Sequence, residues 1–174
     1  RLTQGHTNTT PGAPKARTGP LKETAMKLIY TASQVREAEK PYIEAADYDG
    51  YLMQRAADAV AAEAQDLLRG KDNAKILLLI GPGNNGADTI YAGARLSAKG
   101  HRVDAVIFDP SEKNLELIAR EGGEGTRVLD PEHTHEQLAG YDLTIDGILG
   151  TGSSGAVRGS AGEYLGVLRA AQLD

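Results

Sequence analysis

An uninterrupted apolar run, Ile76 to Ile80, leads directly into a glycine-rich turn, Gly81 to Gly86. A run of this length and character is typical of a strand covered on both faces, as in a parallel sheet. The residues after the turn predict a helix from about Ala87 to Lys99, ended by Gly100. The three segments form one βα unit, which restricts the chain to folds built around a parallel sheet.

Strands and helices alternate along the rest of the chain. The further predicted strands are 102–108, 126–129 and 142–146. The predicted helices are 111–120, 131–139 and a last one that begins at a capping box of Ser160 and Glu163. Such alternation at short spacing predicts an α/β fold: a three-layer, doubly wound, Rossmann-like parallel sheet with helices on both faces.

Two more helices are expected ahead of the first strand. One begins at a capping box of Thr31 and Gln34, and Pro41 should kink or split it. The other runs from Gly50 to Arg69. Its predicted apolar face consists of Leu52, Ala56, Val60, Ala64 and Leu67. Residues 1–25 are rich in Thr, Pro and Gly and nearly free of large apolar side chains, so we predict a disordered tail followed by one domain over 26–174.

Composition excludes several functional classes. A net charge of −5 argues against general nucleic-acid binding, which needs a clustered basic face. No apolar stretch approaches the length of a membrane span. The chain contains no cysteine, so disulfides, thiolate metal sites and a cysteine nucleophile are excluded. These features lead us to expect a soluble protein of the cytoplasm.

The turn Gly81-x-Gly83-x-x-Gly86 satisfies the dinucleotide-binding fingerprint between a strand and a helix. Glycines let phosphate oxygens approach the first N–H groups of the helix, where the helix dipole favours negative charge. One alternative is a tight turn without a ligand, and another is an NAD-dependent dehydrogenase that would hold the ribose through Asp109. Asp88 at the helix start argues against a dehydrogenase, because its carboxylate would repel a pyrophosphate.

A second polar loop follows the predicted strand that ends at Asp146. It carries four glycines and several hydroxyls up to Gly155, with Arg158 just beyond, so it could accept an anion or remain a flexible surface loop. Ligands of doubly wound sheets bind beyond the carboxyl ends of the strands. We therefore expect this loop and the Gly81–Gly86 turn to lie side by side.

Gly81 to Asp88 reads GPGNNGAD and resembles the GxGNNGGDG signature of the YjeF N-terminal-domain family, the NAD(P)H-hydrate epimerases. Residues 30–36 with Leu52-Met53 resemble the opening helices of that family, and 142–158 resembles its D-x-x-x-D-x-(L/I)-x-G-T-G loop. The resemblance covers about residues 28–174. Ala87 and Thr89 stand where the family has glycine. The resemblance also implies a further strand with a D-x-P-S-G motif after Asp174, so we expect a C-terminally truncated form of the family's domain.

The resemblance implies an isomerase of nicotinamide cofactor repair that interconverts the R and S forms of hydrated NADH and NADPH (NADHX and NADPHX). It implies a potassium ion held by Asn85 and Asp146, whose oxygens suit a hard cation. Asp88 is the first candidate for the catalytic acid and base, and Asp146 is the second. The implied substrate contacts are Asn84, Asn85, Gly86, Ala87, Asp88, Gly150, Thr151, Gly152, Ser153, Ser154, Gly155, Ala156 and Arg158.

The resemblance also implies functional coupling to a separate dehydratase, which restores the S form of the hydrate. The oligomeric state is left open, with a homodimer among the alternatives. A competing interpretation of the same fold is a binding or protein-interaction module without turnover. The intact Asn84-Asn85-Gly86-x-Asp88 favours the enzyme, because a module without turnover would not need these polar groups.

Overall fold

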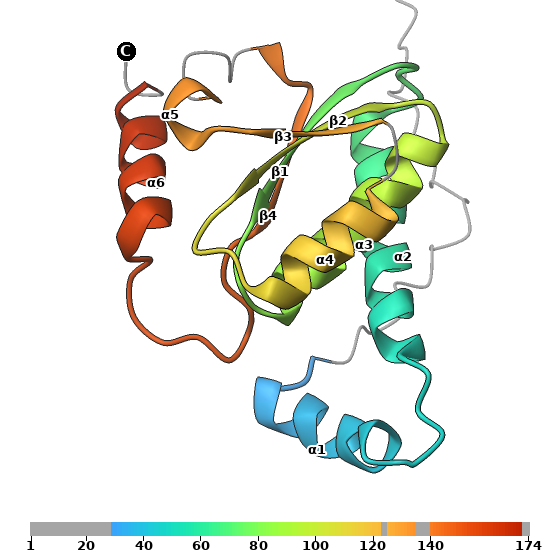
Figure 1. Ribbon diagram of the computed structural model, residues 1–174. Coiled ribbons are helices and arrows are strands. Elements are labelled where there is room, and N and C mark those ends of the chain that lie inside the picture. Colours follow the sequence, from blue (N-terminus) through green and yellow to red (C-terminus); the bar gives the residue numbers. More distant parts are fainter. Residues whose placement is uncertain (1–28, 123–124, 135–139, 172–174) are drawn as a thin grey trace, which may run out of the picture. The chain divides into compact units, whose positions relative to one another are not determined.

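A parallel sheet of four strands organises the described part of the chain, which comprises residues 29–122, 125–134 and 140–171 in this computed structural model (Figure 1). The strands are β1 (Lys75–Ile80), β2 (Arg102–Ile107), β3 (Thr126–Leu129) and β4 (Leu143–Gly147). They lie in the order β3-β2-β1-β4, and every neighbouring pair is parallel. The chain thus moves outward from β1 to β3 and returns to the other side of β1, which makes the β1–β4 pair the switch point of the sheet. The tail predicted at 1–25 lies outside the described residues.

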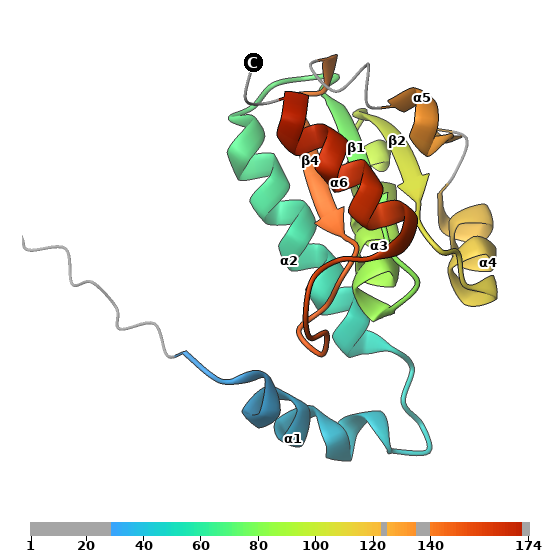
Figure 2. The same cartoon turned by 90° about the vertical axis from the view of Figure 1, so that its left-hand side faces the viewer.

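Helices cover both faces of the sheet, which confirms the predicted layered α/β fold. On one face lie α2 (Tyr51–Leu68), α3 (Asn84–Ala98) and α4 (Glu112–Glu121). The opposite face is covered by α6 (Gly159–Ala171), and the short helix α5 (Pro131–Thr134) lies on the same side (Figure 1). Figure 2 views the sheet through α6. None of the described helices is long and apolar enough to cross a membrane.

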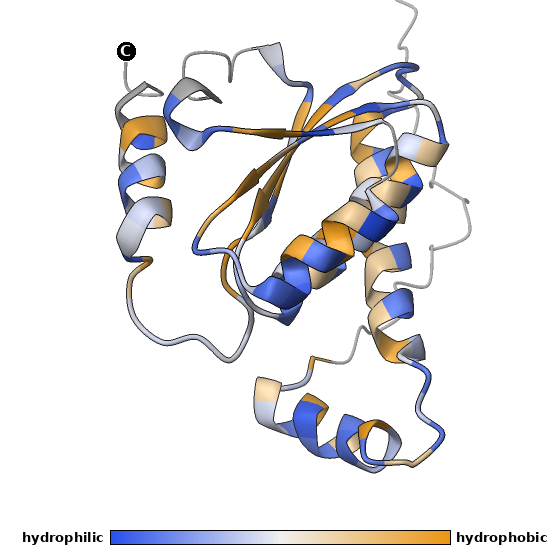
Figure 3. Cartoon of the chain, viewed as in Figure 1, coloured by the Kyte–Doolittle hydropathy of each residue, from blue (hydrophilic) through white to orange (hydrophobic). Residues whose placement is uncertain are grey.

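The alternation of side chains along β1 divides the core into two clusters. Ile76, Leu78 and Ile80 face α2 and α3, whereas Leu77 and Leu79 face α6. The five side chains are at most 2% exposed, as expected for a central parallel strand. Figure 3 shows these apolar strands enclosed by helices whose outer surfaces are hydrophilic. On the α6 face, the rings of Phe108 and Tyr164 lie 5.2 Å apart and anchor the helix.

The buried side of α2 agrees only in part with the predicted apolar face. Ala64 is buried and Val60 packs against the core as predicted, but Ala56 and Leu67 are exposed. The other buried residues are Ala57, Ala61 and Leu68. Helix α2 packs against α3, and small side chains let two helices approach closely. Because α3 lies close, the small alanine side chains of α2 are buried, and the larger Leu67 of the predicted face lies at the surface.

Two predicted features near helix ends differ from the structure, and a third cannot be compared. Helix α1 (Ala32–Ile43) has the predicted Thr31 capping box but continues past Pro41, and none of its residues is buried. Helix α6 begins at Gly159, so Ser160 lies inside it and cannot form the predicted capping box with Glu163. The end of the helix predicted at 131–139 falls outside the described residues.

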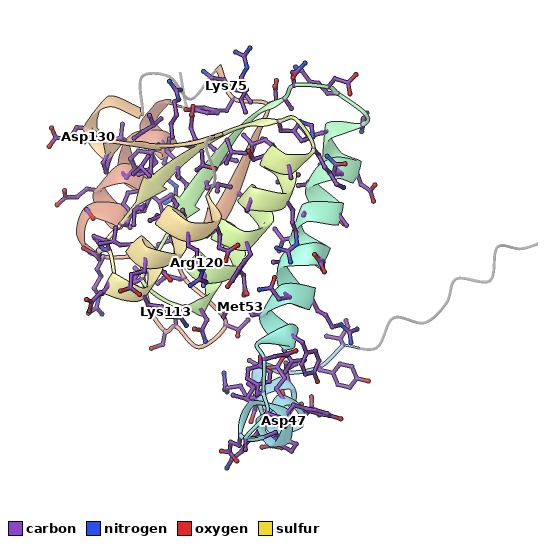
Figure 4. All side chains as sticks on the ribbon, turned by 45° about the vertical axis from the view of Figure 1, so that its right-hand side comes forward. Asp47, Met53, Lys75, Lys113, Arg120 and Asp130 are labelled. Atoms are coloured by element: carbon purple, nitrogen blue, oxygen red, sulfur yellow. The ribbon has the colours of Figure 1, made fainter. Side chains whose placement is uncertain are left out.

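A buried carboxylate ties the far end of the sheet together. Asp104 of β2 accepts two 2.8 Å hydrogen bonds from the Arg127 guanidinium and one of 2.7 Å from the Tyr141 hydroxyl. Burial tends to raise the pKa of Asp104, but the bonds from Arg127 and Tyr141 outweigh burial and lower it. Lys75 lies over the Tyr141 ring, and Figure 4 shows it at the opposite end of the sheet from Lys113. This network serves the fold, because it lies away from the carboxyl ends of the strands.

Candidate functional site

The two polar loops meet at the carboxyl ends of β1 and β4. The Gly81 N–H donates to the Gly147 carbonyl oxygen at 3.1 Å. The Asn85 amide donates to the Leu149 carbonyl oxygen at 3.0 Å. Both contacts follow from the β1–β4 pairing, which brings Ile80 opposite Gly147. The expectation that the two strand ends lie side by side is confirmed.

Helix α3 begins at Asn84, one turn earlier than predicted from the sequence. Gly83 is its N-cap, and its carbonyl accepts the first helical hydrogen bond from the Ala87 N–H. Asn84 and Asn85 therefore lie within the first helical turn. The backbone N–H groups of the residues from Asn84 to Gly86 have no acceptor among the described residues. They face out of the helix at the end where its dipole favours an anion.

Asn84 and Asp88 are separated by one helical turn and share the face of α3 toward α4. The Lys113 ammonium donates to the Asn84 side-chain oxygen at 3.4 Å. Asp88 is half-buried, and its Oδ1 is buried without a hydrogen-bond partner among the described residues. Burial raises the pKa of Asp88, and the nearby Glu39 carboxylate raises it further, whereas Lys113 acts in the opposite direction. A carboxyl group in this environment holds its proton at higher pH than an exposed one.

Asn85 lies on the neighbouring face of α3, toward the β4 loop. Its side-chain nitrogen is fixed on the Leu149 carbonyl, and its backbone carbonyl accepts a 2.8 Å bond from the Thr89 hydroxyl. The side-chain oxygen of Asn85 has no hydrogen-bond partner among the described residues. Asp146 is exposed at the end of β4, and one of its carboxylate oxygens accepts a 2.9 Å bond from the Ile148 N–H.

The two residues expected to hold a cation are an amide and a carboxylate. No group of three or more His, Cys, Asp or Glu able to hold a metal occurs in the part of the chain that the structure describes. Asn85 lies in the first turn of α3, which follows β1, and Asp146 lies at the end of the neighbouring strand β4. Amide and carboxylate oxygens are hard ligands, which suit a hard cation better than a soft one.

Ala87 is turned toward the core. Its side chain is fully buried in the cluster beneath α3, and its N–H donates to Gly83. Contact between Ala87 and the substrate stays a prediction. The sequence signature spans every residue of the turn. In a helix, however, every third or fourth side chain of one face points into the core.

The β4 loop is exposed along its whole predicted binding stretch. Gly150 lies against Asn85, and the Ser153 N–H and hydroxyl both donate to the Gly150 carbonyl at 3.0 and 2.7 Å. This small turn fixes the beginning of the loop. The remaining predicted contacts are likewise exposed: Thr151, Gly152, Ser154, Gly155, Ala156 and Arg158. The loop thus offers open backbone and hydroxyl groups beside the start of α3.

Asp109, the ribose ligand expected for the dehydrogenase alternative, lies near the start of α6. Its backbone has a φ of 45°, in the left-handed region. Its carboxylate lies close to Gly159, the first residue of α6. A negative charge at a helix N-terminus is stabilising. The position of Asp109 therefore favours a structural role over ribose binding.

Two residues at the start of α4, its N-cap Ser111 and Asn114, touch the glycine-rich turn but were not predicted as part of the site. The Ser111 hydroxyl donates to the Pro82 carbonyl, and the buried Asn114 amide donates to the carbonyls of Gly81 and Gly83. A signal was present, because Asn114 precedes Leu117 by three residues and both belong to the buried stripe of α4. A polar residue in such a stripe must find a hydrogen-bond partner.

A hollow of about 150 Å³ adjoins the Asp88 side of α3. Met53 of α2 and Tyr91 of α3 line it together with Lys113, Glu116, Leu117 and Arg120 of α4. Figure 4 shows the long side chains of Lys113 and Arg120 on α4 near Met53. The hollow is small, and Arg120 is held by Glu121 and the Tyr91 hydroxyl.

Comparison with known proteins identifies the family of the chain. The model of the family described as YjeF-related protein N-terminus matches residues 50–172. The chain belongs to this family. It is 35% identical over 137 residues to the bifunctional NAD(P)H-hydrate repair enzyme Nnr of Corynebacterium glutamicum, a match that covers 76% of this chain and 23% of that protein. It is 34% identical over 151 residues to the NAD(P)H-hydrate epimerase of Microbacterium testaceum, covering 85% of this chain and 57% of that enzyme.

A solved structure supports the fold. The crystal structure of yeast ynu0, YNL200c, superposes with a TM-score of 0.65 at 19% identity, covering 84% of this chain and 67% of the yeast chain. At this identity the likeness shows the α/β fold alone. The chain spans less than a third of the length of several bifunctional relatives of the YjeF family and little more than half of the epimerase relative.

Replacing Gly147 with alanine should destabilise the junction of the two loops. A Cβ at this position would overlap the Thr89 hydroxyl and lie 3.1 Å from the Asn85 carbonyl oxygen. Overpacking of this kind costs about 1–3 kcal/mol. Urea unfolding should show this loss for Gly147→Ala and almost none for the control Gly152→Ala, which has open space around it. Equal stability of the two variants would contradict the close packing described here.

Proposed function

We propose that the protein interconverts the R and S forms of hydrated NADH and NADPH at the surface formed by the turn at the start of α3 and the β4 loop. The observation that carries the proposal is the hydrogen bond from Asn85 to Leu149, which joins the two loops in a member of the YjeF family. A relative at 34% identity is named NAD(P)H-hydrate epimerase, and one at 35% identity is named a bifunctional NAD(P)H-hydrate repair enzyme. The unpaired N–H groups at the start of α3 supply a site for the phosphates of the substrate.

The chemistry requires one group that first gives and then takes a proton. The hydrated ring carbon carries a hydroxyl and is bonded to the ring nitrogen. Protonation of the hydroxyl lets the nitrogen lone pair form a C=N⁺ bond as the C–O bond breaks and water leaves. Water then adds to the opposite face of the ring and returns a proton to the enzyme. Atoms and charge balance without an external oxidant or reductant.

Asp88 is the best candidate for this group. Its pKa is raised by burial, which keeps more of the carboxyl protonated near neutral pH than is usual for aspartate. Its Oδ1 has no hydrogen-bond partner among the described residues, so no described contact ties this oxygen to the fold. It follows the phosphate-binding start of α3 by one turn, near where the rest of the nucleotide would extend. Asp146, tied to the Ile148 N–H, is the less suitable acid.

We further propose that Asn85 and Asp146 hold a potassium ion. The fixed nitrogen of the Asn85 amide leaves its oxygen available, and Asp146 lies at the end of the adjacent strand. A bound cation would supply positive charge that offsets the repulsion between substrate phosphates and the nearby carboxylates.

We also propose that the product passes to a dehydratase activity. The hydrate is a damaged cofactor, so a reaction that removes water from it must follow to make epimerisation useful. Relatives in Corynebacterium glutamicum and Mycobacterium tuberculosis are named bifunctional repair enzymes, and this chain matches only 23–31% of their length.

Asp88→Asn should abolish epimerisation and leave nucleotide affinity nearly unchanged, because the amide preserves shape but cannot shuttle a proton. We expect a loss of at least 100-fold in kcat in the full-length protein, measured by chromatography of the R and S hydrates. The matched control is Asp109→Asn, which removes another strand-end carboxylate at a left-handed position that asparagine tolerates. Full turnover by Asp88→Asn, or a comparable loss in Asp109→Asn, would remove Asp88 from this role.

Potassium should stabilise the protein beyond the effect of ionic strength. A cation bound only to the folded state adds about 2.7 kcal/mol at 100 times its dissociation constant. The melting temperature should therefore rise in potassium chloride relative to choline chloride at equal concentration. This difference should vanish in Asp146→Ala, which has no side-chain oxygen, and persist in Asp109→Asn. Its persistence in Asp146→Ala would show that Asp146 is not a ligand.

A further inference from the structure

The first turn of α4 holds three successive carbonyl groups of the glycine-rich turn. The Ser111 hydroxyl donates to the Pro82 carbonyl at 3.1 Å. The Asn114 amide nitrogen donates to the carbonyls of Gly81 at 2.9 Å and Gly83 at 3.2 Å. Ser111 and Asn114 are also joined to each other, because the Ser111 hydroxyl accepts the Asn114 N–H as the N-cap of α4. We name these two residues the α4 clamp.

Asn114 of the α4 clamp lies in the buried stripe of α4, where an apolar side chain would leave the folded state more stable. Asn114 is 1% exposed, and its side-chain oxygen is buried without a partner among the described residues. A buried, unpaired polar atom costs about 1–3 kcal/mol. An apolar side chain beside Leu117 would avoid that cost. The benefit of Asn114 therefore lies in its two bonds to the turn.

The clamp determines where the turn presents its N–H groups. The described peptide bonds are all trans, so each carbonyl points away from the N–H of the following residue. The Pro82 carbonyl points toward the Ser111 hydroxyl, so the Gly83 N–H points away from that hydroxyl. The Gly83 carbonyl is shared by the Asn114 amide and the Ala87 N–H of α3, so the Asn84 N–H points away from both of these donors.

The third glycine of the fingerprint makes room for the clamp. A Cβ at Gly86 would overlap the Gly81 carbonyl oxygen and lie only 3.0 Å from the Asn114 amide nitrogen. The side-chain-free position therefore lets the Gly81 carbonyl and the Asn114 amide meet against the helix.

We propose that Ser111 and Asn114 are positioning residues that orient the N–H groups of Gly83 and Asn84, and with them the side chains of the first α3 turn, toward the nucleotide. The inference rests on the proposed epimerase function, but it assigns residues outside the signature to the site. Neither residue needs to touch the substrate. Their loss should reduce turnover through the geometry of the turn.

Asn114→Asp is the most informative variant, because aspartate has the same shape but its ionised form only accepts hydrogen bonds. It would face two carbonyl oxygens and push the turn away. At pH 8 we expect kcat/KM to fall about 100-fold relative to wild type, as for a displacement of about 1 Å. Protonation restores one donor, so the ratio to wild type measured at the same pH should recover by at least 10-fold at pH 5.5. The control Asn73→Asp adds the same charge at an exposed position and should show neither effect.

A second pair of variants keeps the proposal testable if Asn114→Asp does not fold. Ser111→Ala loses the bond to Pro82 and the cap of α4, whereas the control Thr31→Ala loses only the cap of α1. Both should lose about 1 kcal/mol of stability. Only Ser111→Ala should lower kcat/KM, by about 10-fold. Wild-type turnover in Ser111→Ala, or no recovery of folded Asn114→Asp at low pH, would overturn the proposal.

Amide NMR shifts separate this proposal from the proposed function. If the wild-type protein does not epimerise the hydrates, the proposed function fails, and the clamp is then judged on the Gly83 and Asn84 resonances of the free protein. The clamp predicts that these two amides shift in Ser111→Ala and remain unchanged in Thr31→Ala. Unmoved resonances in Ser111→Ala would reject the clamp whatever the activity.

Discussion

Pairing between β1 and β4 is the interaction on which the site depends. It brings Ile80 opposite Gly147, so the chains leaving the two strands must pass within van der Waals contact. Gly147 has no side chain, which allows the Thr89 hydroxyl and the Asn85 carbonyl to pack directly against its backbone. The Asn85 amide then reaches the Leu149 carbonyl. A shift of β4 by one residue would turn Asp146 to the other face of the sheet and separate both polar loops.

The start of α3 is thereby held from two sides. The β4 loop fixes Asn85 on one side, and α4 fixes the preceding carbonyls on the other. The N–H groups between them have no acceptor within the described part of the chain, so they can meet an anion. Asp88 follows one turn later, in surroundings that raise its pKa. Under the proposed function, phosphate binding and proton transfer fall on successive turns of α3.

The layered parallel sheet and most element ranges were predictable from the sequence, because the buried strand from Ile76 to Ile80 and the glycine-rich turn are local signals. The adjacency of the two loops followed from the topology rule for such sheets. The face of α2, the early start of α3 and the burial of Ala87 were not predictable, since they depend on how closely neighbouring helices approach. Asn114 was missed because its partners lie in a distant turn, 31–33 residues away along the chain.

Amide-resolved NMR of the protein with added NADHX would test most directly whether the two loops together form the nucleotide site. We expect saturable shifts of the amides at the start of α3, from Gly83 to Gly86, and of the β4 loop from Gly150 to Gly155. Amides near Asp104, at the far end of the sheet, should remain unchanged. Shifts confined to one loop, or shifts centred elsewhere on the protein, would show that the two loops do not form the nucleotide site together.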